Sequence, residues 1–303
     1  MSVSEHPIAL RLERQVDEPT RLLATVMGLP LVDGIFPALV IAGALDTATG
    51  VVETGLLVFG GSATVAIILA EMDDPREAVP AVLLIGAALV PLAALEAAVA
   101  PTFRSVLAFE TFRRFAGLVI VAVAAKTASA RVGEYLPRPA VIVGLGAVAS
   151  FQPAGLTLAV TTDPMPILRA AATAAVGVGF ALAVALLGPR LRGSVDLDLF
   201  RFGSAVALGM LALSVLGLMP TEAPVALGVL AVTAVFSFDP DGAGSPVADA
   251  DHDDADDASP ADDVGFDTDR PAADYPVDPD PDAESEDADG VWPSDGDSRA
   301  PWL

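Results

Sequence analysis

The feature that most constrains this chain is a series of long apolar runs between residues 22 and 238, separated by short polar turns. A helix needs about 20 apolar residues to cross the hydrocarbon core of a bilayer, and these runs approach that length repeatedly. A helix on the surface of a water-soluble protein keeps one polar face, whereas these runs are apolar on all sides. The sequence therefore predicts an all-α fold, a polytopic transmembrane helical bundle.

The polar turns divide this region into about eight predicted spans; seven or nine remain open because the last span is short and the fourth is the most polar. The spans are expected at 22–45, 51–71, 78–100, 115–134, 139–161, 166–188, 199–219 and 222–238. With eight spans, most loop arginines fall on the side of the N-terminus, although the opposite loop 101–114 also carries three. Because basic loops favour the cytoplasm, we expect a multi-pass protein of the cell membrane with both termini cytoplasmic.

The negative charge of the chain gathers at its C-terminal end. The net charge is −24, and residues 239–303 hold 22 of the 40 acidic residues against 2 arginines. High charge, low hydrophobicity and frequent proline prevent such a segment from forming a core. We therefore predict three regions: a leader at 1–21 that can form an amphipathic helix, a transmembrane helical domain at 22–238, and a disordered acidic tail at 239–303.

The composition excludes several classes of site. The chain has no cysteine and only two histidines, both outside the apolar region. Thiolate sites, His-centred zinc or haem sites and a Ser-His-Asp triad therefore do not fit the membrane domain. Basic patches for nucleic acid are absent as well. We expect no enzyme, no metal and no cofactor. Arginine exceeds lysine and aspartate exceeds glutamate, which is typical of extreme halophiles, whose acidic proteins stay solvated in concentrated salt.

Asp33 lies near the middle of the first predicted span, beside the predicted helix breaks Pro30, Gly34 and Pro37. Ionisable residues at membrane depth are costly and usually face a cavity or a partner. A broken helix frees backbone groups, and a carboxylate beside them can hold a cation or a proton. The alternative is a carboxylate that stays protonated, or pairs with a neighbouring helix, only for packing.

Two further polar positions extend this predicted pathway. Lys126 lies at a similar predicted depth in the fourth span, so Asp33 and Lys126 are a candidate ion pair, most simply a structural one. Gln152 precedes a predicted helix break at Pro153 within the fifth span. It either lines a pathway or bonds a carbonyl that a proline kink frees.

The remaining acidic residues of the apolar region lie closer to span ends. Glu96 is about one turn from the end of the third span, where it either lines the pathway or extends to the interface. For other charged residues at span ends, extension to the interface is a sufficient explanation. These are Glu53, Glu71, Asp163 and Arg169. The hypothetical substrate or ion pathway therefore consists of Asp33, Lys126, Gln152 and Glu96.

Two segments 88 residues apart resemble each other. Residues 101–117 read PTFRSVLAFETFRRFAG and residues 189–204 read PRLRGSVDLDLFRFGS. Each begins with proline after an apolar run and contains an arginine, an acidic and apolar stretch, and Phe-Arg before the next run. A true duplication would be inverted if the two segments lie on opposite sides of the membrane, as in many secondary transporters. It would be parallel if both lie inside, and the sequence leaves this open.

Both tryptophans of the chain lie in the acidic tail: Trp292 in GVWPSDG, and Trp302 before the terminal Leu303. In a segment that is otherwise solvated, they form either a docking motif for a protein partner or a contact with the membrane. The alternative is that they are incidental.

The segments GLPLVDGIFPALVIAGAL and FGGSATVAIILAEMDDP resemble the opening of an uncharacterised family of multi-span membrane proteins of extremely halophilic archaea. The resemblance covers residues 20–238 and implies a class and a membrane location, without an activity. A looser likeness to small exporters built from duplicated three-helix units, with an acidic residue in the first helix, fits Asp33 but transfers no residue roles.

The leading functional hypothesis is an integral membrane protein that transports a small solute or ion through a midplane site. The alternative is a non-transporting assembly or regulatory component whose acidic tail binds partners. The expected partners are the lipid bilayer, a small solute or ion, and a protein bound through the tail, with no nucleic acid.

Overall fold

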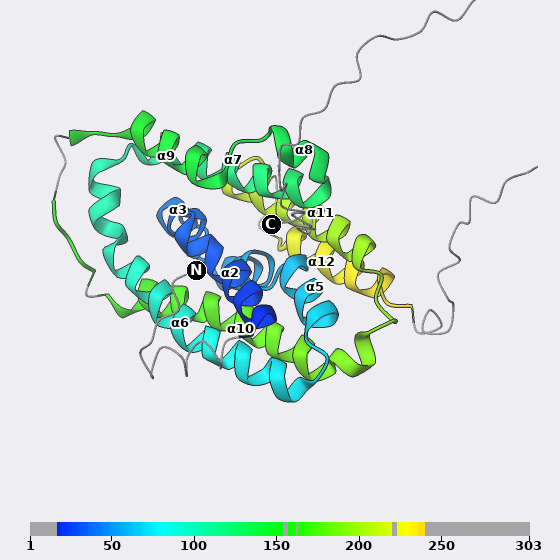
Figure 1. The fold of residues 1–303 in the computed structure, drawn as a ribbon. Coiled ribbons are helices and arrows are strands. Elements are labelled where there is room, and N and C mark those ends of the chain that lie inside the picture. Colours follow the sequence, from blue (N-terminus) through cyan, green and yellow to red (C-terminus); the bar gives the residue numbers. More distant parts are fainter. Residues whose placement is uncertain (1–16, 154–156, 162, 220–222, 240–303) are drawn as a thin grey trace, which may run out of the picture. The chain divides into compact units, whose positions relative to one another are not determined.

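The computed structural model describes residues 17–153, 157–161, 163–219 and 223–239 (Figure 1). The chain divides into two compact units, and the first, Met1–Ser245 with Trp302, contains all of these residues. The second unit, Pro246–Pro301 with Leu303, lies outside the described residues. Apart from Asp239, the predicted acidic tail with its tryptophan motif and most of the predicted leader therefore lie outside them too.

The described residues form helices and no strand, which confirms the predicted all-α architecture. The helices are α2 (Glu18–Val32), α3 (Ile35–Ala42), α4 (Ala48–Thr54), the π-helical turn η1 (Gly55–Phe59), α5 (Ser62–Glu71), α6 (Pro75–Val106), α7 (Phe109–Ala128), α8 (Ala130–Tyr135), α9 (Pro139–Ser150), α10 (Pro164–Leu191), α11 (Leu197–Val215) and α12 (Val225–Phe236).

Three described helices, α6, α10 and α11, are long and apolar enough to cross a membrane. The number rises to five if each of two bent helix pairs counts as one span. The predicted count of about eight is not confirmed, because α7 is not among the candidate spans and α9 and α12 have only 12 residues each. Such a helix is about 18 Å long, which is shorter than the hydrocarbon core of a bilayer. These apolar helices are compatible with a membrane location.

Two predicted spans end earlier than expected. The helix expected to continue to residue 161 stops at Ser150, because residues after it form backbone hydrogen bonds with the connection between α6 and α7. The fourth span is interrupted at Ser129, which has an extended backbone and whose Oγ accepts a hydrogen bond from Val132 N–H (3.4 Å). This side-chain cap starts the short helix α8 and separates it from α7.

The first bent pair is α2 and α3, which meet at an angle of 41°. Gly34 sits between them with a φ of +76°, a left-handed conformation that favours glycine. Pro30 lies inside α2, near its C-terminal end, and Pro37 lies in the first turn of α3. Asp33 is the C-cap residue that follows α2.

The second bent pair is α4 with η1, followed by α5, and its bend is 46°. Gly60 and Gly61 form the break. Close packing also requires glycine at Gly55, the first residue of η1, since a Cβ there would lie 2.6 Å from Thr173 O of α10. The π-helical turn therefore packs directly against the backbone of α10.

Six of the remaining helices form two sets of similar length and order. The first set is α6, α7 and α9, and the second set is α10, α11 and α12. Helix α6 packs along α10, α7 packs along α11, and the bent pairs lie between these layers (Figure 1). The end of α6 meets the start of α10, since Thr161 N–H donates to Ala98 O (3.0 Å) and Thr102 Oγ donates to Ala159 O (2.7 Å). Helices α6 and α10 therefore run antiparallel.

The two sets repeat the same local interactions. In each, an isolated antiparallel bridge joins the connection after the first helix to the end of the third, Leu107 with Phe151 and Val195 with Phe238. The hydrogen bonds of the bridges are Ala108 N–H to Ser150 O (2.7 Å) and Gln152 N–H to Val106 O (2.7 Å), and Asp196 N–H to Ser237 O (2.8 Å) and Asp239 N–H to Ser194 O (2.8 Å). The paired positions lie 87 or 88 residues apart, the spacing of the two similar sequence segments.

An ion pair occurs at the same place in each set. Glu110 pairs with Arg113 (3.2 Å) at the start of α7, and Asp198 pairs with Arg201 (3.9 Å) at the start of α11. Each acidic residue precedes its arginine by three positions, and the two pairs are 88 residues apart. The arginines belong to the Phe-Arg dipeptides that the sequence comparison matched.

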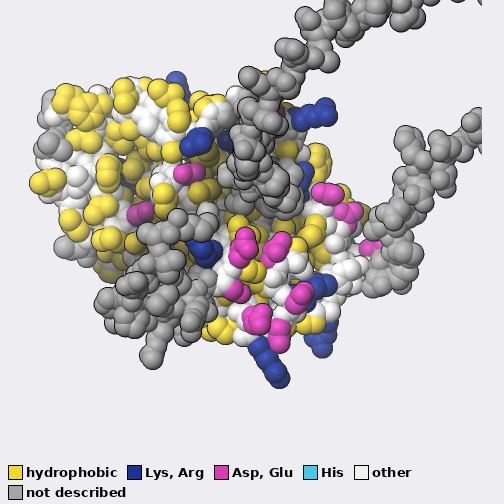
Figure 2. Space-filling model, viewed as in Figure 1, with side chains coloured by type: hydrophobic (Ala, Val, Ile, Leu, Met, Phe, Trp, Pro, Cys, Tyr) yellow, Lys and Arg dark blue, Asp and Glu magenta, His cyan; other side chains and the backbone are white. Residues whose placement is uncertain are grey.

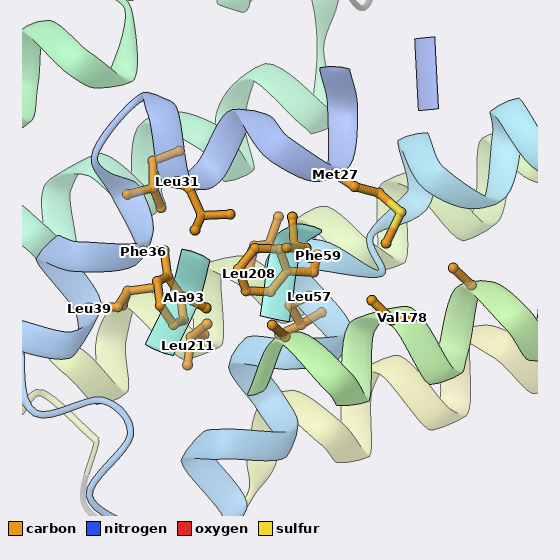
Figure 3. Packing of buried hydrophobic residues seen from close by; sticks show 14 of the residues in the cluster. Met27, Leu31, Phe36, Leu39, Leu57, Phe59, Ala93, Val178, Leu208 and Leu211 are labelled. Atoms are coloured by element: carbon orange, nitrogen blue, oxygen red, sulfur yellow. The ribbon is translucent and has the colours of Figure 1, made fainter. Parts of the chain in front are cut away.

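The core lies where the bent pairs meet the long helices (Figure 3). Phe36 follows the first break, Phe59 precedes the second, and their ring centroids are 5.2 Å apart. Leu208 and Leu211 of α11 and Ala93 of α6 pack around them (Figure 3). The two helix breaks thus flank an apolar centre.

On the visible face of the molecule, hydrophobic side chains cover one part and acidic side chains gather over another (Figure 2).

Candidate functional site

The structure does not bring the four predicted pathway residues together. Asp33 is half-buried at the bend between α2 and α3. The adjacent Gly34 lies against Val143 of α9, whose Cγ1 is 3.3 Å from the position of a Cβ on that glycine. No ion pair or side-chain hydrogen bond of Asp33 occurs within residues 17–153, 157–161, 163–219 and 223–239. This carboxylate is therefore placed at a helix break and remains unpaired.

Lys126 lies in the last turn of α7 and not at the middle of the helix. Its side chain packs against α8, where its Cγ is 3.3 Å from the position of a Cβ on Gly133. The described part of the chain contains four ion pairs, Arg113–Glu110, Arg169–Asp46, Arg192–Asp73 and Arg201–Asp198. Lys126 belongs to none of these ion pairs, and its stem lies against α8, which the Ser129 cap starts.

Gln152 and Pro153 are exposed and lie after the end of α9. The backbone N–H of Gln152 donates to Val106 O (2.7 Å), so the observed role of this position is in the backbone bridge. The predicted proline break therefore falls beyond the helix.

Glu96 occupies a more constrained place. It lies on α6, on the face that carries the buried residues Ala93 and Ala100, three positions before it and four after it. Ala93 lies beside Phe36 and Leu39 of α3 (Figure 3). The Oε2 atom of Glu96 has almost no accessible surface and no hydrogen-bond partner among the described residues. Such an oxygen is an open acceptor for a proton, a water or a cation.

Glu53 is the acidic residue that the sequence prediction misplaced. Extension to the interface is wrong for it, because only 7% of the residue is exposed. Its carboxylate accepts hydrogen bonds from the backbone amides of Leu227 and Ala226 in the first turn of α12. It also borders a cavity of about 10 Å³ next to Ser214, about the smallest space that can hold a single water. The sequence feature that could have indicated the burial of Glu53 is the Gly60-Gly61 pair, which marks the segment as a broken helix in the interior.

Two hydroxyl oxygens are, like the Oε2 atom of Glu96, buried without a hydrogen-bond partner among the described residues. Thr54 Oγ1 and Ser204 Oγ are buried and have no hydrogen-bond partner in the described part of the chain. Thr54 is fully buried and immediately precedes the π-helical turn, a feature often found at functional sites. Within the described residues, no group of three or more His, Cys, Asp or Glu could hold a metal ion.

The class is thus an all-helical protein with three to five candidate membrane spans, which fits an integral membrane protein. The sequence model of a family described as "Family of unknown function (DUF5794)" matches residues 89–216. The match runs from the middle of α6 to the residue after α11, and so covers parts of both helix sets. No curated protein and no solved structure matches the chain. The matched region is therefore similar to an uncharacterised domain.

Proposed function

We propose that this protein is a membrane transporter of a small solute or ion, built as an inverted repeat around two broken helices. Its first half would comprise α2–α3 with the first set, and its second half α4–η1–α5 with the second set. The observation that carries the proposal is the antiparallel course of α6 and α10 together with matching bridges and ion pairs at a spacing of 87 or 88 residues.

Inverted repeats are a common architecture of secondary transporters, with the substrate site near the midplane on discontinuous helices. Here both discontinuous helices lie between the α6–α10 pair and the α7–α11 pair (Figure 1). In this proposal, each bent pair and each helix of the two sets traverses the membrane, and the bilayer thins around the short helices α9 and α12. The chain then crosses eight times, and both ends of the membrane domain lie on the same side, which we assign to the cytoplasm.

The pathway residue that the geometry favours is Glu96. Its unpartnered oxygen lies on the α6 face that carries Ala93, which packs beside Phe36 and Leu39 of α3 (Figure 3). Glu53 is a weaker candidate, because the α12 amides already satisfy its carboxylate. A carboxyl group with an open acceptor can take up either the transported cation or a proton that drives transport.

The test is ion flux into liposomes that contain the purified full-length chain and a pH-sensitive dye. Gradients of Na⁺, K⁺, Mg²⁺ and Ca²⁺ are imposed in turn, in concentrated salt. At least one gradient should drive a pH change well above that of empty liposomes, and Glu96→Gln should abolish it. Glu77→Gln is the matched control, because Glu77 is exposed on the same helix. Absence of flux with every cation, or unchanged flux in Glu96→Gln, would contradict the proposal.

A further inference from the structure

We infer that Arg104 and Arg192 are a matched pair of clamps, each holding the free end of one broken helix and so keeping one side of the molecule closed. The inference rests on the proposed transport function. The two arginines are 88 residues apart, at the same place in the two helix sets. Arg104 lies near the end of α6, and Arg192 follows the last residue of α10.

Arg104 binds the end of α3. Its Nε donates to Ile41 O (3.2 Å) and one terminal nitrogen donates to Val40 O (2.7 Å). Helix α3 ends one residue later, at Ala42. The guanidinium group thus reaches two carbonyls of the last turn at once.

Arg192 binds the end of α5 in the same way. Its Nε donates to Leu69 O (3.0 Å), and its terminal nitrogens donate to the carbonyl oxygens of Met72 and Asp73. Its guanidinium group also lies 3.8 Å from the carboxylate of Asp73. Helix α5 ends at Glu71, so these carbonyls belong to its last turn and to the residues just after it.

The chemistry explains why arginine occupies both places. The last carbonyls of a helix have no partner within the helix and carry the negative end of its dipole. The planar guanidinium group offers five donors in a fixed fork, so it can bond several carbonyls together while its charge complements the dipole. These bonds are charge-assisted and therefore stronger than bonds between neutral groups.

The other end of each half-helix is a hinge. Helix α3 begins after Gly34, whose φ is +76°, and α5 begins after Gly60 and Gly61. Each half-helix is therefore a short lever with a glycine hinge near the core and an arginine clamp at its outer end. Because α6 and α10 are antiparallel, the two clamps lie at opposite ends of this helix pair. Loss of the hydrogen bonds of one arginine clamp frees the half-helix that it holds and opens that side of the molecule.

The two clamps differ in strength. Arg192 bonds three carbonyls and pairs with Asp73, whereas Arg104 bonds two carbonyls and has no acidic partner among the described residues. The side closed by α3 should therefore open more readily than the side closed by α5.

The test uses the absence of cysteine from the chain. Single cysteines replace Leu39 of α3 and Ile67 of α5, which are both buried, in the full chain reconstituted in liposomes. The measurement is the rate of reaction with a membrane-impermeant maleimide. Arg104→Gln should speed labelling of the α3 reporter about tenfold or more, the effect of losing two charge-assisted hydrogen bonds, and leave the α5 reporter unchanged. Arg192→Gln should do the reverse.

Arg104→Lys and Arg192→Lys should give intermediate rates, because lysine keeps the charge without the fork. Arg201→Gln, which removes only a surface ion pair, is the control and should change neither rate. If either clamp variant speeds the labelling of both reporters equally, or of neither, the inference that the two arginines act as clamps is contradicted. Labelling requires no substrate, so absence of ion flux with reporter-specific acceleration would reject transport while leaving the clamps in place.

Discussion

The two helix sets share their scaffold and differ in their chemistry. The bridges, the ion pairs at the starts of α7 and α11, and the clamping arginines all recur at a spacing of 87 or 88 residues. Glu96 does not recur, because the position 88 residues later is the buried Val184. Lys126 likewise corresponds to Ser214. The repeated residues hold the fold, and the unrepeated polar residues are where a specific function is to be sought.

The N-terminal ends of α9 and α12 also differ between the two helix sets. Helix α12 receives the buried carboxylate of Glu53 on its first-turn amides, whereas α9 begins at Pro139 and the preceding Arg138 provides no side-chain cap. An acidic group at a helix N-terminus is favourable for both hydrogen bonding and the helix dipole. The second set is therefore anchored to its broken helix by an interaction that the first set lacks.

The largest effect on stability is expected from Glu53→Ala. This change leaves the amides of Ala226, which is buried, and Leu227, which is half-buried, without this acceptor and should lower the free energy of unfolding by about 2–4 kcal/mol. Thermal unfolding of the purified protein in detergent measures it. Glu53→Gln keeps one acceptor and should cost less. Glu96→Gln should change stability little, because the Oε2 atom of Glu96 has no partner to lose. Equal losses for Glu53→Ala and Glu96→Gln would remove the distinction between an anchoring and an open carboxyl group.

A smaller effect is expected from Gly177→Ala in α10. A Cβ there would lie 2.4 Å from the Cβ of Phe59, so the π-helical turn must shift. Overpacking of this kind costs about 1–3 kcal/mol. Gly179→Ala is the matched control: it meets nothing within 4 Å, and alanine is the better helix former. Comparable melting temperatures for the two variants would mean that η1 does not pack on α10 as described.

The smallest effect is expected from Ser150→Ala and Ser237→Ala, which remove equivalent hydroxyls at the ends of α9 and α12. Ser150 Oγ donates to Gly146 O (2.6 Å), and Ser237 Oγ donates to Thr233 O (2.5 Å). Each change should cost about 1 kcal/mol, and the two losses should be similar. A clear difference between them in chemical unfolding would weaken the equivalence of the sets.

The sequence predicted the features that depend on local pattern. Long apolar runs indicated helices throughout, and the structure is all-helical where it is described. The similar segments at 101–117 and 189–204 pointed to a duplication, and matching bridges and ion pairs occur at their spacing. The features it missed depend on tertiary partners. The end of α9 requires the bridge to the α6–α7 connection, and the burial of Glu53 requires the amides of α12. Uniformly apolar helices give no periodicity that shows which face is inside.

The inverted arrangement is tested most directly by the sidedness of Glu110 and Asp198. Both side chains are exposed, 67% and 93%, and they occupy equivalent positions of the two sets. Each is replaced by cysteine in the full chain, in sealed membrane vesicles of uniform orientation, and labelled with an impermeant maleimide. An inverted repeat predicts that one position reacts from outside the vesicle and the other reacts only after the membrane is permeabilised. Reaction of both from the same side would contradict it.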